Sequence, residues 1–172
     1  MSPETTHRIL LAGIGNIFLG DDGFGPAVLG RVAAGPLPTG VRAVDYGIGG
    51  MHLAYDLLGD WDALILVDAV PGRGNPGAVR VFEVDPGKTG IATQLDAHAM
   101  DPGSVFASVE ALGGTLPRTI VVGCQAACVA EGIGLSAPVA AAVDGAIEAI
   151  GRLLSELGAD APERCRTVGS EG

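Results

Sequence analysis

Short apolar runs alternate along this chain with longer segments that carry hydrophobic residues at helical spacing. The apolar runs predict five strands, at residues 8–14, 41–46, 63–67, 77–84 and 119–123. The helical spacing predicts four helices, at about 24–34, 51–58, 102–112 and 137–157. This alternation predicts an α/β fold: a single-domain three-layer α/β/α sandwich whose mostly parallel, twisted sheet has helices on both faces.

The polarity of each predicted strand indicates whether it lies at the centre or near the edge of the sheet. The run 63–67 is apolar at every position, as expected of a central parallel strand covered on both faces. The run 77–84 contains Arg80 and Glu83, which favours a place nearer the edge. Ser136 is a typical N-cap for the last helix. We expect one domain over residues 1–158 and a flexible polar tail over 159–172.

Three acids follow three of the predicted strands. Asp22, Asp45 and Asp68 each lie at the downstream end of an apolar run or in the turn after it. The carboxyl ends of parallel strands meet at one edge of the sheet, where open α/β folds bind their ligands. The pattern therefore predicts a site at this edge that is rich in carboxylates.

Each candidate also has an ordinary structural interpretation. Asp21 and Asp22 precede a helix, where one of them could act as its N-cap. Asp68 could hydrogen bond within the turn at Pro71-Gly72. His98 lies in the long segment 85–102, which lacks a regular pattern, and a solvated loop histidine is the simpler assignment. Loops of that length in compact domains are usually functional, however.

Together, Asp22, Asp68 and His98 offer two carboxylates and one imidazole. This mixed set suits a divalent transition ion such as nickel, manganese, iron or zinc. Three protein ligands leave coordination positions open for a substrate. Gly13 and Gly15 belong to neither a dinucleotide fingerprint nor a phosphate loop, since no third glycine and no Gly-Lys-Ser/Thr follow. We expect them to permit a tight turn and to admit a bulky ligand.

Composition narrows the class of protein. The 172 residues carry a formal net charge of −10, which argues against a nucleic-acid partner. No apolar run approaches the roughly 18 residues of a membrane span, and the first residues do not read as a signal peptide. We therefore expect a soluble, cytoplasmic protein without a membrane partner. Cys124, Cys128 and Cys165 form no disulfide framework, and we expect reduced, buried thiols and at most a weak zinc signal.

The chain resembles the hydrogenase maturation proteases over nearly all of residues 8–157. The resemblance rests on an ordered series of motifs: Gly13-Ile14-Gly15-Asn16 with Asp21-Asp22-Gly23-Phe24-Gly25, Asp45-Tyr46-Gly47-Ile48-Gly49-Gly50, Val67-Asp68-Ala69, Pro76-Gly77, Asp96-x-His98 and Gly132-Ile133-Gly134-Leu135-Ser136-x-Pro138-Val139. Two positions depart from the family pattern. Asp22 stands where relatives often have glutamate, and Gln125-Ala126 where they often have Glu-Pro.

This resemblance implies an endopeptidase that removes a C-terminal extension from the large-subunit precursor of a nickel–iron hydrogenase, after nickel insertion. The nickel belongs to the substrate, so no permanently bound cofactor is expected. The family's recognition of that nickel falls on Asp22, Asp68 and His98. Substrate contacts fall on Asp45, Gly47, Gly49, Gly50 and Asn16. We expect a monomer whose partner is the precursor.

Two mechanisms and two other functions stay open. The nickel could polarise the scissile carbonyl while a carboxylate activates water, or it could only position the substrate while the acids perform general acid–base catalysis. A non-catalytic, nickel-dependent escort of the immature subunit would use the same three residues. A module that binds an anion at the helix start is the other alternative, against which the adjacent acids Asp21 and Asp22 argue.

Overall fold

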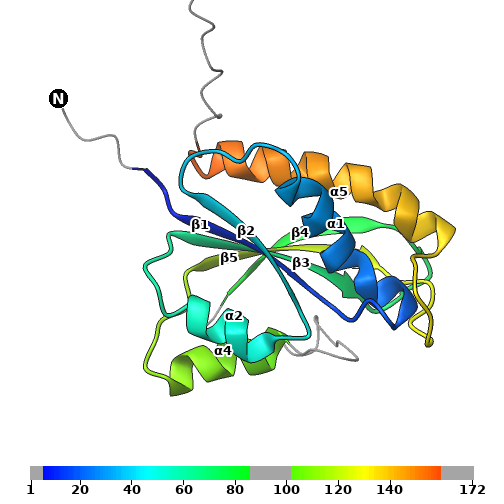
Figure 1. Cartoon of the computed structure of the whole chain (residues 1–172), viewed down its shortest axis with the longest axis horizontal. Helices are drawn as coiled ribbons and strands as arrows, with labels where there is room; N and C mark the ends of the chain where they lie inside the picture. Colours follow the sequence, from blue (N-terminus) through cyan, green and yellow to red (C-terminus); the bar gives the residue numbers. More distant parts are fainter. Residues whose placement is uncertain (1–5, 86–101, 160–172) are drawn as a thin grey trace, which may run out of the picture.

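A computed structural model describes residues 6–85 and 102–159 of the chain (Figure 1). The sheet has five strands in the order β2-β1-β3-β5-β4, all parallel except β4, which runs antiparallel to β5. The strands are β1 (Ile9–Ile14), β2 (Val41–Gly47), β3 (Ala63–Val70), β4 (Val79–Val84) and β5 (Arg118–Gln125). The helices are η1 (Gly20–Gly23, a 3₁₀ turn), α1 (Phe24–Ala33), α2 (Gly50–Asp56), α4 (Pro102–Ala111) and α5 (Ala137–Glu156).

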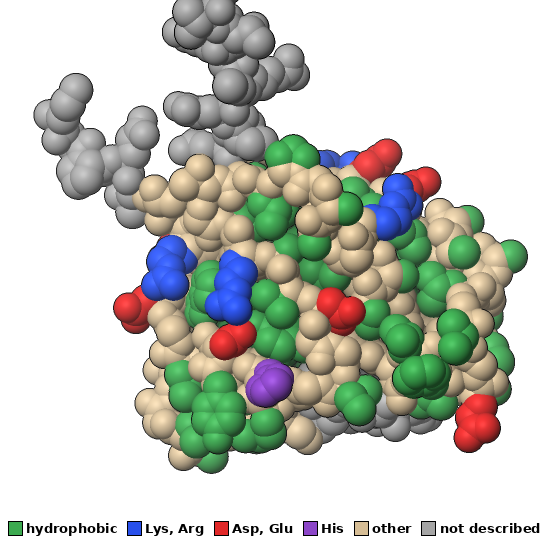
Figure 2. All heavy atoms as spheres, in the orientation of Figure 1, with side chains coloured by type: hydrophobic (Ala, Val, Ile, Leu, Met, Phe, Trp, Pro, Cys, Tyr) green, Lys and Arg blue, Asp and Glu red, His purple; other side chains and the backbone are tan. Residues whose placement is uncertain are grey.

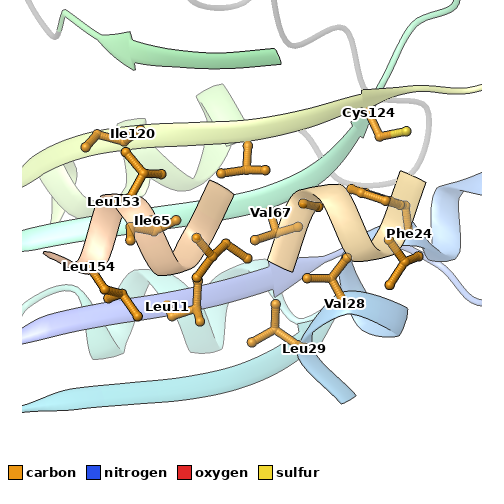
Figure 3. Packing of buried hydrophobic residues seen from close by; sticks show 14 of the residues in the cluster. Leu11, Phe24, Val28, Leu29, Ile65, Val67, Ile120, Cys124, Leu153 and Leu154 are labelled. Atoms are coloured by element: carbon orange, nitrogen blue, oxygen red, sulfur yellow. The ribbon is translucent and has the colours of Figure 1, made fainter. Parts of the chain in front are cut away.

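Helices cover both faces of the sheet, which confirms the predicted three-layer α/β/α architecture. α1 and α5 lie on one face, and α2 and α4 lie on the other (Figure 1). Alternate residues of the central strands divide between the two hydrophobic clusters: Ile65 and Val67 face α1 and α5, whereas Leu64 and Leu66 face α2 and α4. Figure 3 shows the first cluster, where Phe24, Val28 and Leu29 of α1 pack against the sheet.

The described strands and helices match the predicted ones apart from the short η1 turn, which was not predicted, and β3 and β5 extend furthest beyond their predicted ends. β3 continues to Val70, so Asp68 lies within a strand rather than in the turn that follows it. β5 spans Arg118–Gln125, beyond the apolar run 119–123. Both extensions occur because the two strands pair with each other up to the contact of Val70 with Gln125. The edge position predicted for the fourth strand is confirmed.

The strand order places a topological switch point between β1 and β3. From β1 the chain passes through α1 to β2 on one side, and from β2 through α2 to β3 on the other side of β1. α1 and α2 therefore diverge onto opposite faces of the sheet. The carboxyl ends of strands at such a point form the crevice in which open α/β folds bind ligands. None of the helices described here is long and apolar enough to cross a membrane.

Candidate active site

Asp22 and Asp68 meet at this switch point. Asp22 follows β1 in the η1 turn, and Asp68 is the sixth residue of β3. Both side chains are almost inaccessible, with 4% and 2% of each residue exposed. The backbone N–H of Asn16 donates to Asp22 Oδ2 at 2.7 Å, which fixes that carboxylate at the end of β1. The structure thus brings together two of the three residues predicted to bind a metal.

Asp68 is electrostatically the most perturbed carboxyl group of the site. Burial raises its pKa well above the ordinary value, and the negative charge of Asp22 raises it further. Against these effects stands one hydrogen bond, from the backbone N–H of Ala69. A buried carboxyl with a like charge beside it favours its protonated form until a cation or another donor arrives. This arrangement can bind a cation or hold a proton for acid–base catalysis.

Asp21 differs sharply from Asp22 although the two are adjacent. Its Oδ2 accepts hydrogen bonds from Ala127 N (2.8 Å), Cys128 N (3.0 Å) and the Ser136 hydroxyl (2.9 Å). Its Oδ1 accepts a fourth, from Ser136 N at 2.7 Å. Burial alone would raise the pKa of Asp21, but these hydrogen bonds outweigh it and the pKa is lowered. Asp21 therefore ties η1 to the segment between β5 and α5.

The N-cap position predicted for Ser136 is confirmed, whereas the capping role considered for Asp21 and Asp22 is wrong. The N-cap of α1 is Gly23, with no side-chain hydrogen bond, so neither acid caps that helix. Ser136 does occupy the N-cap of α5, but its hydroxyl donates to Asp21 rather than capping the helix. The side chains of Asp21 and Ser136 hydrogen bond with each other across the fold, so neither caps a helix.

The glycines after β1 admit protein backbone rather than a ligand. A Cβ added at Gly15, where φ is +139°, would lie 1.9 Å from the carbonyl oxygen of Asp22. One added at Gly25 would lie 2.3 Å from Ile14 O and 2.5 Å from Val67 O. These two glycines therefore let η1 and α1 close over the ends of β1 and β3, which carries Asp22 toward Asp68. The expected space for a bulky ligand at Gly13 and Gly15 is wrong.

The turn after β2 lies beside the same edge. Asp45 is exposed and its Oδ1 accepts from Gly47 N at 2.9 Å, forming a local turn. Gly47 has φ of +55° and its carbonyl accepts from Gly15 N at 2.9 Å, linking this turn to the end of β1. Gly49 and Gly50 lead into α2. Asn16 holds the preceding loop, because its Oδ1 accepts from Phe18 N. Contact of these residues with a substrate stays a prediction.

The third predicted ligand, His98, lies outside the described residues, as does most of the long segment 85–102. Among the residues that are described, no three His, Cys, Asp or Glu side chains gather into a metal site. Cys124 is fully buried against Val67 and Val122, as predicted, whereas Cys128 is exposed. Burial, and secondarily the charge of Asp21, raises the pKa of the Cys124 thiol to about 11. A thiol held protonated in this way is no nucleophile.

Exposed apolar side chains in the loops at this edge, and one at the start of α2, were not predicted as part of a site. They follow the carboxyl ends of β1, β2 and β5: Ile17 and Phe18, Ile48 and Met51, and Ile133. Phe18 O accepts from Gly132 N, so two of these loops are joined. Hydrophobic side chains also gather at the end of the molecule where Figure 1 places the start of α1 (Figure 2). Their exposure could not be inferred locally, because an apolar loop residue packs inward as readily as outward.

Comparison with known proteins identifies relatives that cover most of the chain. A hydrogenase expression/formation protein, HupD of Rhizobium leguminosarum bv. viciae, is 33% identical over 92% of this chain and 79% of its own. A putative hydrogenase maturation protease of Methanocaldococcus jannaschii is 34% identical over 83% of this chain and 93% of its own.

Similar solved structures belong to the same class of protein as these relatives. The hydrogenase maturating endopeptidase HybD from Escherichia coli superposes with a TM-score of 0.73 at 27% identity, covering 88% of this chain and 94% of that one. Residues 32–153, which include Asp45 and Asp68, match the hydrogenase maturation protease family itself. Because both the sequence match and the shared fold extend over most of the chain, the chain belongs to the hydrogenase maturation proteases and is an endopeptidase.

Proposed function

We propose that this endopeptidase removes the C-terminal extension of a nickel–iron hydrogenase large-subunit precursor, and that Asp22, Asp68 and His98 recognise nickel already inserted in that substrate. The observation that carries the proposal is the buried pair of Asp22 and Asp68 at the switch point, two carboxylates with one backbone donor each, the N–H of Asn16 and the N–H of Ala69. Among the described residues, no basic side chain raises or lowers the pKa of Asp68. Such a pair suits a cationic ligand.

Nickel carried by the substrate supplies the missing positive charge. A divalent ion beside two carboxylates replaces their mutual repulsion with attraction and lowers the pKa of the buried acid. The site would then reach its ionised form only when a nickel-loaded precursor is bound. This electrostatic requirement explains why cleavage would follow nickel insertion rather than precede it.

The exposed apolar loops support a protein substrate. Five large side chains, each about half exposed or more, surround the edge that holds the acids: Ile17, Phe18, Ile48, Met51 and Ile133. Exposed apolar surface of this kind is typical of protein interaction sites. We infer that the folded body of the precursor docks here, against the loops that follow β1 and β2.

The test is co-expression with the large-subunit precursor of the same organism, with and without nickel, followed by intact mass spectrometry of the precursor. The wild-type protein should release a C-terminal peptide only when nickel is supplied. Asp68→Asn, which keeps the shape of the side chain, should lower the cleavage rate by at least about a thousandfold, the loss typical of a group acting at the reacting centre.

The matched control is Asp144→Asn, an exposed carboxylate on α5 that pairs with Arg31, and it should cleave at the wild-type rate. Full processing by Asp68→Asn would refute the assigned role of the acid pair. A stable nickel-dependent complex with a precursor of unchanged mass would instead identify a non-catalytic escort.

A further inference from the structure

A row of paired residues runs from Asp68 across the sheet to Arg80. Asp68 of β3 pairs with Gly123 of β5, and Gly123 pairs with Arg80 of β4. Residues paired in this way project from the same face of the sheet, and neighbouring strands lie about 4.8 Å apart. The Cα atoms of Asp68 and Arg80 are therefore about 10 Å apart, with no side chain on the strand between them.

A pocket of about 450 Å³ opens beside this row. Val70 and Phe82 contribute apolar walls, while Arg73, Arg80 and Gln125 contribute polar groups. A Cβ added at Gly123 would lie 2.8 Å from Val70 and 3.8 Å from Phe82, so the glycine keeps the floor of the pocket open. Within the part of the chain that the structure describes, no acidic residue lines the pocket.

The two arginines of the pocket are free to bind an external anion. Arg31, Arg42 and Arg118 each pair with a carboxylate of the protein. Arg73 and Arg80, in contrast, form no ion pair with any described residue. In a chain with a net charge of −10, two such guanidinium groups in one pocket form a local basic site. The planar guanidinium fork matches a carboxylate, which it can bind through two parallel hydrogen bonds.

Gln125 builds the wall that carries Arg73. The side chain of Gln125 is buried, and its Oε1 accepts from Arg73 N at 2.9 Å and Asn75 N at 3.3 Å. Its backbone carbonyl accepts from Gly77 N and its N–H donates to Ala78 O. The loop from β3 to β4 is thus held against the end of β5. Gln125 is a positioning residue, and the pocket is preformed rather than assembled on binding.

We propose that this pocket binds the carboxylate of an acidic side chain in the C-terminal segment that the enzyme removes. This inference rests on the proposed function. With nickel at Asp22 and Asp68 and the folded substrate against the loops after β1 and β2, the departing segment runs toward β5 and β4. An extended chain advances about 3.3 Å per residue, so a span of about 10 Å places the acid about three residues after the cleaved bond.

The experiment measures KM and kcat for nickel-loaded precursor with the wild-type enzyme and with the double variant Arg73→Gln/Arg80→Gln. We expect KM to rise about tenfold or more while kcat changes less than threefold, because the contact is remote from the reacting bond. The matched control is Arg31→Gln/Arg152→Gln, which removes the same charge from the helices α1 and α5 and should keep both constants. Equal melting temperatures show that both variants are folded.

The substrate side is tested by changing each Asp or Glu of the removed segment to its amide. One such change should raise KM for the wild-type enzyme by the same factor and have no further effect on the double variant, which is the signature of a direct pair. Changing that acid to Lys should restore binding to Arg80→Glu.

The outcomes separate the two proposals. Nickel-dependent cleavage by the wild type with an unchanged KM for the double variant overturns the pocket assignment and leaves the proposed function intact. A KM that responds only when the terminal carboxylate is amidated overturns the acidic side chain as ligand. Absence of cleavage by the wild-type enzyme refutes the proposed function, and the pocket assignment falls with it.

Discussion

Asp21 and Asp68 are both buried carboxyl groups at one edge of the same sheet, yet their surroundings differ. Asp21 accepts four hydrogen bonds from the loop before α5, and its pKa is lowered. Asp68 has one backbone donor and a second carboxylate beside it, and its pKa is raised. Burial is common to both, so burial alone does not identify a functional acid. What identifies a functional acid here is the small number of hydrogen-bond donors that the protein supplies to it.

The difference assigns the two groups opposite roles. A carboxylate whose donors all come from the protein holds two segments together and has little capacity left for a ligand. A buried carboxylate with a single donor and a like charge beside it destabilises the fold until a partner from outside supplies a positive charge or a proton. We therefore interpret Asp21 as a structural residue and Asp68, with Asp22, as the acidic centre of the active site.

The largest effect on stability is expected from Asp21→Ala. It leaves three backbone N–H groups and one hydroxyl in a partly buried loop without their acceptor, at a cost of about 3–5 kcal/mol in the free energy of unfolding. Asp21→Asn keeps most of these acceptor contacts and should cost about 2 kcal/mol. Urea denaturation at pH 7 measures both.

Asp68→Asn is the contrasting variant, and it should not lower stability at all. Cleavage should show the opposite order, with Asp21→Asn active once folded and Asp68→Asn inactive. If Asp21→Ala unfolded at the wild-type urea concentration, the distinction between the two acids would be lost.

A smaller effect, with opposite signs for the two acids, is expected in the pH dependence of unfolding. The pKa of Asp21 is lowered in the folded state, so its stabilisation is present above about pH 4 and is lost as pH falls through the folded pKa. The pKa of Asp68 is raised, so its contribution is complete below about pH 4 and is lost as pH rises through the folded pKa.

The free energy of unfolding of the two Asn variants should therefore depart from that of the wild type in opposite directions as pH changes. Asp68→Asn should match the wild type at pH 3 and should be more stable than the wild type at pH 7. The deficit of Asp21→Asn should be greatest at pH 7 and should shrink below pH 4. Urea denaturation between pH 3 and 8 provides the curves. Parallel curves for the three proteins would contradict the opposite pKa shifts.

The strands and the edge that holds the acids could be predicted because they follow from local pattern. Apolar runs identify β1 and β3, and parallel pairing then brings Asp22 and Asp68 to one end. Asp22 was predicted as the site residue, but the structural role of Asp21 could not be predicted, since the donors to Asp21 come from residues 127–136, more than a hundred positions away. Likewise, Arg73 and Arg80 share a pocket only because β4 runs antiparallel to β5.

The smallest expected effect concerns Cys124, which senses the charge of Asp21. The thiol has a pKa of about 11, raised first by burial and then by that charge, against an ordinary value of 9.0. At pH 8 the raised pKa alone reduces the thiolate fraction of Cys124 about a hundredfold, and burial slows the access of any reagent further.

With Cys165 replaced by Ser, a thiol reagent should label exposed Cys128 rapidly and Cys124 only on unfolding. After correction for the lower stability of the variant, Asp21→Asn should accelerate labelling of Cys124 by less than tenfold, because the larger cause of the pKa shift, burial, is unchanged. An acceleration in Asp68→Asn instead would mean that the charge acting on the thiol belongs to the active-site pair, and that Asp21 is not the ionised acid of this edge.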